Sequence, residues 1–308
     1  MVQGDEGWRT ESGRQLAENV FAALSEGRGL DDLGLPESDG RVDLRGLTLP
    51  DRPGSPSLTL RDVRLTGLDL TRSRLPHLRL HNCQVDDCVF DDATMPDLRM
   101  WGSRILSSSL ARANLRNVTV AGTGPGTPAN WIESVDFSGA DMSEASINEA
   151  VVSSCTFAYA NLDRAQFIRA WLTDCVFRGP LTEVLFDSRP VDGRAIAPFT
   201  RVDLSEAHLD LTEFHSCEFV DPVFPSDPDE VLIVPNFGRV GPAALDRLAD
   251  DDSEAAGDLR VIINGALTQD GASPDSTWLI AVQDLEDWPS GGHLLDLAKV
   301  VFGHGDGS

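Results

Sequence analysis

The sequence has little lysine, few aromatic residues and no long apolar run. Lysine occurs once, at Lys299, among 25 basic residues, and aromatic residues make up 6% of the chain. No apolar stretch reaches the roughly 18 residues that a transmembrane helix needs. The first residues also lack the basic-then-apolar layout of a secretory signal peptide. We therefore expect a cytoplasmic protein that does not associate with membranes.

Sequence motifs of catalysis and of metal binding are missing as well. The five cysteines include no CxxC pair, and the six histidines include no HExxH or other zinc-ligand spacing. The stretch GTGPG at 122–126 lacks the third glycine of a dinucleotide-binding loop. No nucleophile elbow or Walker motif occurs. These absences predict a protein that is not an enzyme and that holds no cofactor and no metal.

Negative charge is abundant but unevenly placed. The formal net charge is −25. Residues 58–120 carry nine basic and seven acidic residues, whereas residues 225–308 carry four basic and 16 acidic ones. A strongly acidic field repels nucleic acid, so we expect no direct nucleic-acid binding.

The most regular feature of the chain is an apolar residue at every fifth position. From Leu60 to Val120 all thirteen positions at this spacing are apolar, and from Phe137 to Phe177 all nine are. The residue two positions before each of these centres is mostly small. A helix would advance about 500° over five residues, so a period of five gives it no continuous apolar stripe.

The inward positions alternate in spacing between two and three residues, which indicates short extended segments joined by corners. A spacing of two puts both side chains on one face of a strand, and the extra residue turns the corner. Four such sides close a coil of 20 residues, and the 29 quintets predict an all-β solenoid of about seven coils. The same rule predicts a core ladder that sets Phe137, Phe157 and Phe177 in one column and Cys155 beside Cys175.

Several quintets resemble the A(D/N)Lxx signature of the pentapeptide-repeat proteins. Examples are ADMSE at 140–144, CTFAY at 155–159 and ANLDR at 160–164. The resemblance covers about residues 42–224 and implies a right-handed quadrilateral β-helix. Some members of that family mimic DNA toward DNA gyrase and protect it from poisons, so the resemblance also implies gyrase as a partner.

The extent of the repeat divides the chain into three parts. We expect an N-terminal capping helix within residues 1–41, the β-helix in residues 42–224, and a small α+β domain in residues 225–308. Ser12 and Gln15 have the spacing of a capping box, which predicts a helix over about residues 12–26. Solenoids need their end coils covered, so this helix is expected to cap the rod.

Two interruptions of the repeat, at residues 121–134 and 178–201, predict projecting loops. The first is rich in glycine and proline and carries Trp131. We interpret Trp131 either as an anchor for a partner or as a plug packed on the rod. In the C-terminal part, the segment DLRVIINGAL at 258–267 favours a strand.

The outward residues of the quintets form the surface that a partner would contact. Glu144 lies 20 residues before Arg164, and Glu149 lies 20 before Arg169, so these neighbours are expected to cancel each other's charge. Only the rear half of the rod could supply a row of like charge. The candidate partner-binding residues are Trp131, Asp136, Asp141, Glu206, Asp210, Glu213 and Glu218.

Three functions remain open on this evidence. The first is a non-enzymatic scaffold that presents a rigid β-helix surface to a partner protein. The second is DNA-mimicking protection or inhibition of gyrase or topoisomerase, of the antibiotic-resistance type. The third is ligand binding or enzymatic activity in the C-terminal domain, with the rod as scaffold. A terminal domain could also hold a homodimer together.

Overall fold

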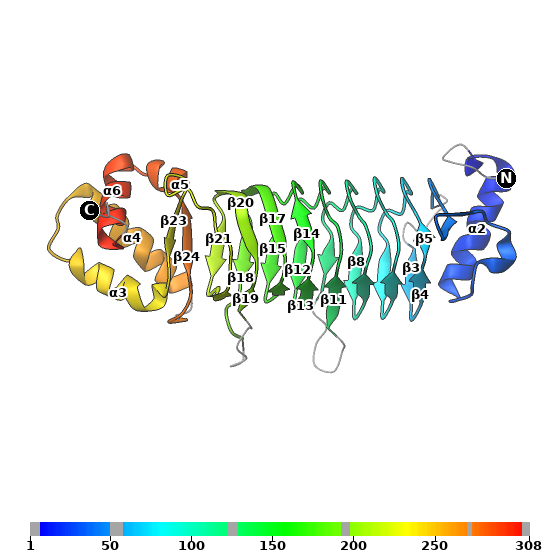
Figure 1. The fold of residues 1–308 in the computed structure, drawn as a ribbon, viewed down its shortest axis with the longest axis horizontal. Helices are drawn as coiled ribbons and strands as arrows, with labels where there is room; N and C mark the ends of the chain where they lie inside the picture. Colours follow the sequence, from blue (N-terminus) through cyan, green and yellow to red (C-terminus); the bar gives the residue numbers. More distant parts are fainter. Residues whose placement is uncertain (1–6, 50–57, 122–128, 192–197, 270–272, 304–308) are drawn as a thin grey trace.

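The protein is an elongated rod with a helical unit at each end (Figure 1). A computed structural model describes residues 7–49, 58–121, 129–191, 198–269 and 273–303. Between the two ends the chain winds in coils whose short strands stack in parallel along the rod axis. This arrangement confirms the expected all-β solenoid with an N-terminal helix and a C-terminal unit of helices and a small sheet.

Two faces of the rod are eight-stranded parallel sheets. The first face consists of β3 (Thr59–Arg61), β6 (Arg79–His81), β8 (Arg99–Trp101), β10 (Thr119–Val120), β12 (Ser146–Asn148), β15 (Gln166–Ile168), β18 (Leu185–Asp187) and β21 (Glu213–His215). The second face consists of β4 (Arg64–Thr66), β7 (Gln84–Asp86), β9 (Arg104–Leu106), β11 (Asn130–Glu133), β13 (Ala150–Ser153), β16 (Trp171–Thr173), β19 (Phe199–Thr200) and β22 (Phe219–Val220).

The other two faces are built mostly from single bridges between coils. The third face includes β5 (Leu68–Asp69), β14 (Thr156–Ala158), β17 (Val176–Thr182) and β20 (Asp203–Asp210), linked through bridges such as Asp69↔Val89 and Asp136↔Thr156. Bridges from Thr48 through Arg74, Thr94, Asn114 and Asp141 to Asn161 mark the fourth face. The four-sided coil predicted from the period of five is therefore present.

The inward side chains fill the rod as predicted. The rings of Phe137 and Phe157 stack with centroids 5.1 Å apart, and those of Phe157 and Phe177 stack at 4.8 Å. Cys155 lies beside Cys175, and both thiols are free and buried. Contact with the Cys175 thiol, together with burial, raises the pKa of Cys155. These cysteines act as small core residues.

The chain has one more coil than expected, because the segment 178–201 is largely part of the rod. Strand β17 extends into it, and β18 and β19 lie within it. Only residues 192–197 of this segment fall outside the described residues. The prediction of a projecting loop over the whole of 178–201 was wrong. One irregular coil, with a register shift between Val176 and Arg178, hides the period of five there.

The N-terminal unit covers the front end of the rod. Helix α2 (Glu11–Ser25) buries Val20, Phe21 and Leu24 in the same apolar cluster as the rod interior. The 3-10 helix η1 (Asp31–Leu33) follows, and β1 (Glu37–Ser38) pairs antiparallel with β2 (Arg41–Asp43). The predicted capping box was wrong, since the N-cap is Thr10, whose hydroxyl accepts a hydrogen bond from the Gly13 N–H.

The C-terminal unit covers the rear end with a two-stranded antiparallel sheet. Strands β23 (Val231–Val234) and β24 (Trp278–Ala281) have one side, with Leu279, in the rod core and the other side, with Ile280, in a separate core. The helices that build this second core are α3 (Phe237–Arg247), α4 (Glu254–Gln269), α5 (Val282–Glu286) and α6 (Gly291–Val301).

The segment 258–267 lies in helix α4, so the strand predicted for it was wrong. Its β-branched residues favoured a strand in isolation. Ala256, Leu259 and Ile263 recur at helical spacing, however, and all three are fully buried in the second core. Tertiary packing on this face therefore decided the secondary structure. No helix among the described residues is long and apolar enough to span a membrane.

Candidate partner-binding surface

A column of partly exposed apolar and aromatic side chains runs along the second face. In the register of the sheet, Trp131 pairs with Val151 and Val151 pairs with Trp171, so three neighbouring strands present them in one line. Trp131 is 37% exposed, while Val151 and Trp171 are half-buried. On the preceding coil Arg104 lies over the Trp131 ring, with the guanidinium carbon 5.7 Å from the ring centroid. Trp131, Val151 and Trp171 are called the apolar column below.

Trp131 lies on the rod itself and not on a projecting loop. It belongs to β11, which pairs with β9 on one side and β13 on the other. The residue before it, Asn130, is fully buried at an inward position. Its amide nitrogen donates to the Ala121 carbonyl at 2.7 Å, and its amide oxygen accepts from the Ser103 N–H at 2.9 Å. These bonds bring the chain back into the stack immediately before Trp131.

Both long connections of the repeat join the same two faces. One runs from β10 to β11 and the other from β18 to β19, which is from the first face to the second in each case. The partners Asp174 and Arg201 are 27 residues apart, where undisturbed neighbours such as Asp92 and Arg112 are 20 apart. The apolar column lies on the second face between these two points. Residues 122–128 and 192–197 lie outside the described residues.

Sequence reasoning found Trp131 but missed Trp171, Val151 and Arg104. The signal that would have found them is their position in the quintet. Each stands immediately before the inward centre of its strand, and the second-face partners are separated by one coil. Applying the 20-residue rule to outward as well as inward positions would have placed Val151 beside Trp171.

The structure does not bring the six candidate acidic residues together. They are spread over all four sides of the rod, and none of them is paired with another across neighbouring coils, so they form no row along the axis. Asp136 lies on the third face, Asp141 on the fourth, Glu213 on the first, Glu218 precedes the last strand of the second, and Glu206 and Asp210 lie along β20.

Most of these carboxylates also have partners within the chain. Asp136 accepts the Ser138 N–H at 2.8 Å, and Asp141 accepts the Ser143 hydroxyl at 2.8 Å. Glu206 lies 3.5 Å from Arg178, Glu213 lies 2.6 Å from His215, and Glu218 accepts the Ser273 hydroxyl at 2.6 Å. Their geometry indicates roles in turns, ion pairs and end-cap contacts.

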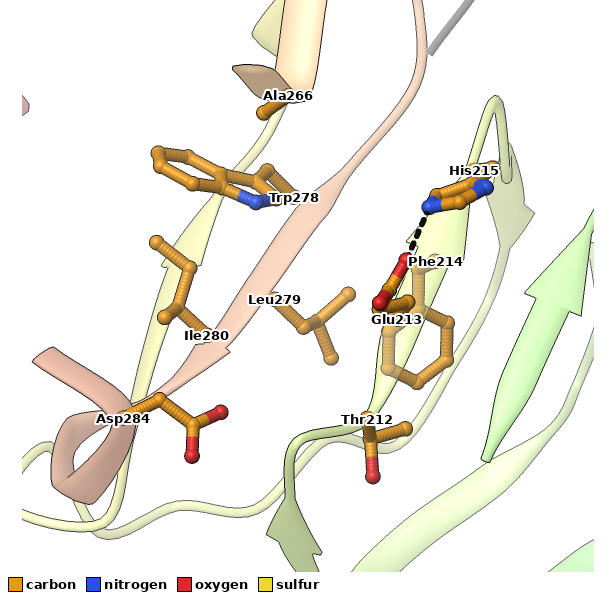
Figure 2. A pocket seen from close by; sticks show the side chains of 9 residues that line it. All are labelled: Thr212, Glu213, Phe214, His215, Ala266, Trp278, Leu279, Ile280 and Asp284. Carbon is orange, nitrogen blue, oxygen red and sulfur yellow. Dashed lines mark ion pairs between the residues drawn. The ribbon is translucent and has the colours of Figure 1, made fainter. Parts of the chain in front are cut away.

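A small cavity of about 90 Å³ lies where the C-terminal sheet meets the last coil of the rod. Figure 2 shows Leu279 of β24 facing β21, with the Glu213–His215 pair on one side and Asp284 on another. Its volume is well below the roughly 300–1,000 Å³ of typical ligand pockets. Within the described residues no group of His, Cys, Asp and Glu side chains could hold a metal ion.

Asp284 fastens the C-terminal unit to the rod beside this cavity. Its carboxylate accepts the Leu211 N–H at 3.3 Å. Burial raises the pKa of Asp284, and the nearby Asp210 and Asp287 add to the rise. The carboxyl is therefore held in a place that disfavours its charge, which identifies a structural contact between rod and cap.

A known family of repeats matches part of the rod. Residues 136–179 match the family model of pentapeptide repeats, in eight copies. They form the coils that stack Phe137, Phe157 and Phe177. Residues 136–179 are therefore made of pentapeptide repeats. No curated protein sequence matches it.

Solved structures of pentapeptide repeat proteins resemble the rod. HetL, involved in heterocyst differentiation regulation in the cyanobacterium Nostoc sp. strain PCC 7120, is 17% identical, with a TM-score of 0.30, over 63% of this chain and 91% of HetL. QnrB1, a plasmid-mediated fluoroquinolone resistance protein, is 17% identical, with a TM-score of 0.19, over 60% of this chain and 92% of QnrB1. Rfr23 from the cyanobacterium Cyanothece 51142 is 13% identical, with a TM-score of 0.20, over 43% of this chain and 92% of Rfr23.

Proposed function

We propose that this protein is a non-catalytic scaffold that binds a partner protein along the second face of its rod. The observation that carries the proposal is the apolar column, with Arg104 stacked against its first tryptophan. Tryptophan and arginine are enriched among the residues that dominate the energy of protein interfaces. A flat parallel sheet holds them rigidly, so a partner loses little binding energy to ordering the surface.

The ends of the rod support a lateral binding site. Helix α2 packs its apolar side on the front coil, and β23 and β24 pack theirs on the last coil. Each end cap is part of the chain's own core, which leaves the sides of the coils for a partner. A partner-binding site on a side also agrees with the filled interior of the described coils, whose inward residues are buried.

The two alternative functions receive less support. A DNA mimic needs rows of like charge, whereas Asp136, Asp141 and Glu213 lie on three different faces and have local partners. The fluoroquinolone resistance stated for QnrB1 belongs to that protein. For a ligand-binding C-terminal unit, the cavities described at its junction with the rod are small, about 90 and 250 Å³.

The proposal is tested by affinity capture from host extract with matched variants. The double variant Trp131→Ala and Trp171→Ala removes both rings of the apolar column. The control is Tyr159→Ala, because Tyr159 is a 66% exposed aromatic residue at a corner of the third face. We expect a bound protein to be retained by the wild type and by the control, and to lose affinity at least about tenfold for the double variant.

Equal capture by all three proteins would contradict the proposed face. Thermal unfolding of each variant accompanies the capture. Because Trp131 is exposed and Trp171 half-buried, we expect the double variant to remain folded. A direct binding assay with the purified captured protein then measures the loss of affinity.

A further inference from the structure

Five arginines crowd the front of the first and second faces of the rod. Arg79 and Arg99 are paired across neighbouring strands, as are Arg61 with His81 and His81 with Trp101. On the second face, Gln84 lies between Arg64 and Arg104. The five arginines form what is called the arginine strip: Arg61, Arg64, Arg79, Arg99 and Arg104.

The arginine strip lacks carboxylate partners in the described part of the chain. Among the described residues, no carboxylate lies within ion-pair distance of Arg61, Arg64, Arg99 or Arg104, and the contacts of Arg79 are to backbone carbonyls. Many other rod arginines are paired, for example Arg112 with Asp92 at 2.9 Å. In a protein with a net charge of −25, such a group of free cations is unusual.

Stacking these cations costs stability. Like charges directly opposite each other on a sheet are destabilising. Burial lowers the pKa of Arg79, and its neighbour Arg99 lowers it further. Burial likewise lowers the pKa of His81, with further contributions from Arg61 and Arg79. A bound anion would relieve this repulsion, so the complex would be stabilised relative to the free protein.

The strip also has an aromatic centre and continues into the apolar column. The His81 and Trp101 rings stack with centroids 4.4 Å apart and planes at 10°. Arg104, the last member of the strip, lies over Trp131, the first member of the apolar column. From Arg64 on the first coil to Trp171 on the sixth, the surface extends over about 24 Å at the usual spacing of strands.

We propose that the arginine strip docks an acidic, extended segment of the partner protein whose apolar part covers the apolar column. This inference rests on the proposed function and adds the chemistry of the partner. The guanidinium group binds carboxylates in bidentate fashion, and Arg79 and Arg99 present two such groups on neighbouring strands.

The surroundings of the strip favour a short acidic peptide over nucleic acid. The negative charge of Asp62 raises the pKa of His81, and that of Asp97 raises the pKa of Arg79, against the larger effects that lower both. These two aspartates border the strip, so the positive surface is narrow. The 16 acidic and four basic residues of 225–308 add a repulsive field at the rear. A long polyanion would be repelled by the flanking aspartates and by the acidic C-terminal part. A short segment with a few carboxylates in line would avoid both.

Fluorescence anisotropy with the full chain tests the inference. The probes are a labelled oligoglutamate peptide and a labelled oligothymidine of equal charge. The test variant is Arg79→Gln with Arg99→Gln, and the matched control is Arg112→Gln with Arg164→Gln, which removes the same charge from arginines that already have partners. We expect the peptide to bind in a salt-sensitive manner, with affinity reduced about tenfold in the test variant and little changed in the control.

Other outcomes would overturn the inference. Peptide binding that is absent, or that falls equally in test and control variants, contradicts a docking site at the strip. Tighter binding of oligothymidine assigns the strip to nucleic acid instead. Salt-sensitive self-association in sedimentation velocity, lost in the test variant, assigns it to a second copy of the chain. If the Trp131 and Trp171 variants still abolish partner capture, the proposed function survives any of these failures.

Discussion

The front and rear coils of the rod share the same four-sided backbone but differ in the side chains that fill their interiors. In the rear coils the rings of Phe137, Phe157 and Phe177 stack in one column, and Phe167 meets Phe157 and Phe177 edge-on. In the front coils the inward residues are mostly leucine, valine and methionine. There Phe90 has no ring contact among the described residues. The rear therefore gains packing energy that the front lacks.

The surfaces of the two regions differ in how their arginines are paired. Rear arginines are paired with carboxylates, such as Arg169 with Glu149 at 2.8 Å and Arg201 with Asp174 at 2.6 Å. The front arginines of the strip have no such partners in the described part of the chain. The difference shows that a uniform coil can be specialised by position, with stability concentrated at the rear and free charge at the front.

The largest expected effect comes from comparing Phe157→Leu with Phe90→Leu. Both changes conserve most of the volume of a fully or nearly fully buried ring. Phe157 loses two stacked neighbours, while Phe90 loses none. We expect Phe157→Leu to lower the free energy of unfolding by about 1–3 kcal/mol more than Phe90→Leu. Urea unfolding of both variants measures the two changes in the free energy of unfolding. Equal decreases would contradict the proposed difference in packing between front and rear.

A smaller effect is expected from removing one arginine in each region. Arg169→Gln breaks its pair with Glu149 and should lower stability by up to about 1 kcal/mol. Arg99→Gln relieves its repulsion with Arg79 and should raise stability by a few tenths of a kcal/mol, roughly 0.2–0.5. Thermal unfolding at low ionic strength compares them, and both shifts should shrink in high salt. Shifts of the same sign would refute the contrast in charge pairing.

The smallest effect concerns the rear cap and depends on pH. Because the folded-state pKa of Asp284 is raised, the folded chain binds its proton more tightly, and stability falls as pH rises through that pKa. Asp284→Asn keeps an acceptor for the Leu211 N–H and removes the charge. We expect a slightly higher melting temperature than wild type at neutral pH and no difference at about pH 4. The exposed Glu286→Gln is the control, and an equal pH dependence in both variants would contradict the assignment.

The interior of the rod could be predicted from sequence because its constraint is local. Each inward position admits one large or one small apolar residue. Spacing alone therefore predicts the inward positions of Phe137, Phe157 and Cys155. The pairs Glu144–Arg164 and Glu149–Arg169 followed from the same 20-residue rule and are present at 3.4 and 2.8 Å.

What could not be predicted depends on where the chain rejoins the stack. Trp131 was placed in a loop because the seven extra residues of its coil hide the point of return, which the buried amide of Asn130 determines. Helix α4 was missed because its local residues favour a strand, and the decision comes from packing against other helices. The arginine strip was missed because cations from different coils meet only once the coils are stacked.

The caps at both ends have a consequence for how such a rod can change length. The described parts of the two caps lie at opposite ends of the rod (Figure 1), so duplicating one 20-residue turn between Ala145 and Arg164 would preserve both end contacts. Each added turn would move one end from the other by about 4.8 Å. The distance between the two ends therefore changes in steps of one coil. A rod of this kind can match the separation of two contact points on a partner by its number of whole turns.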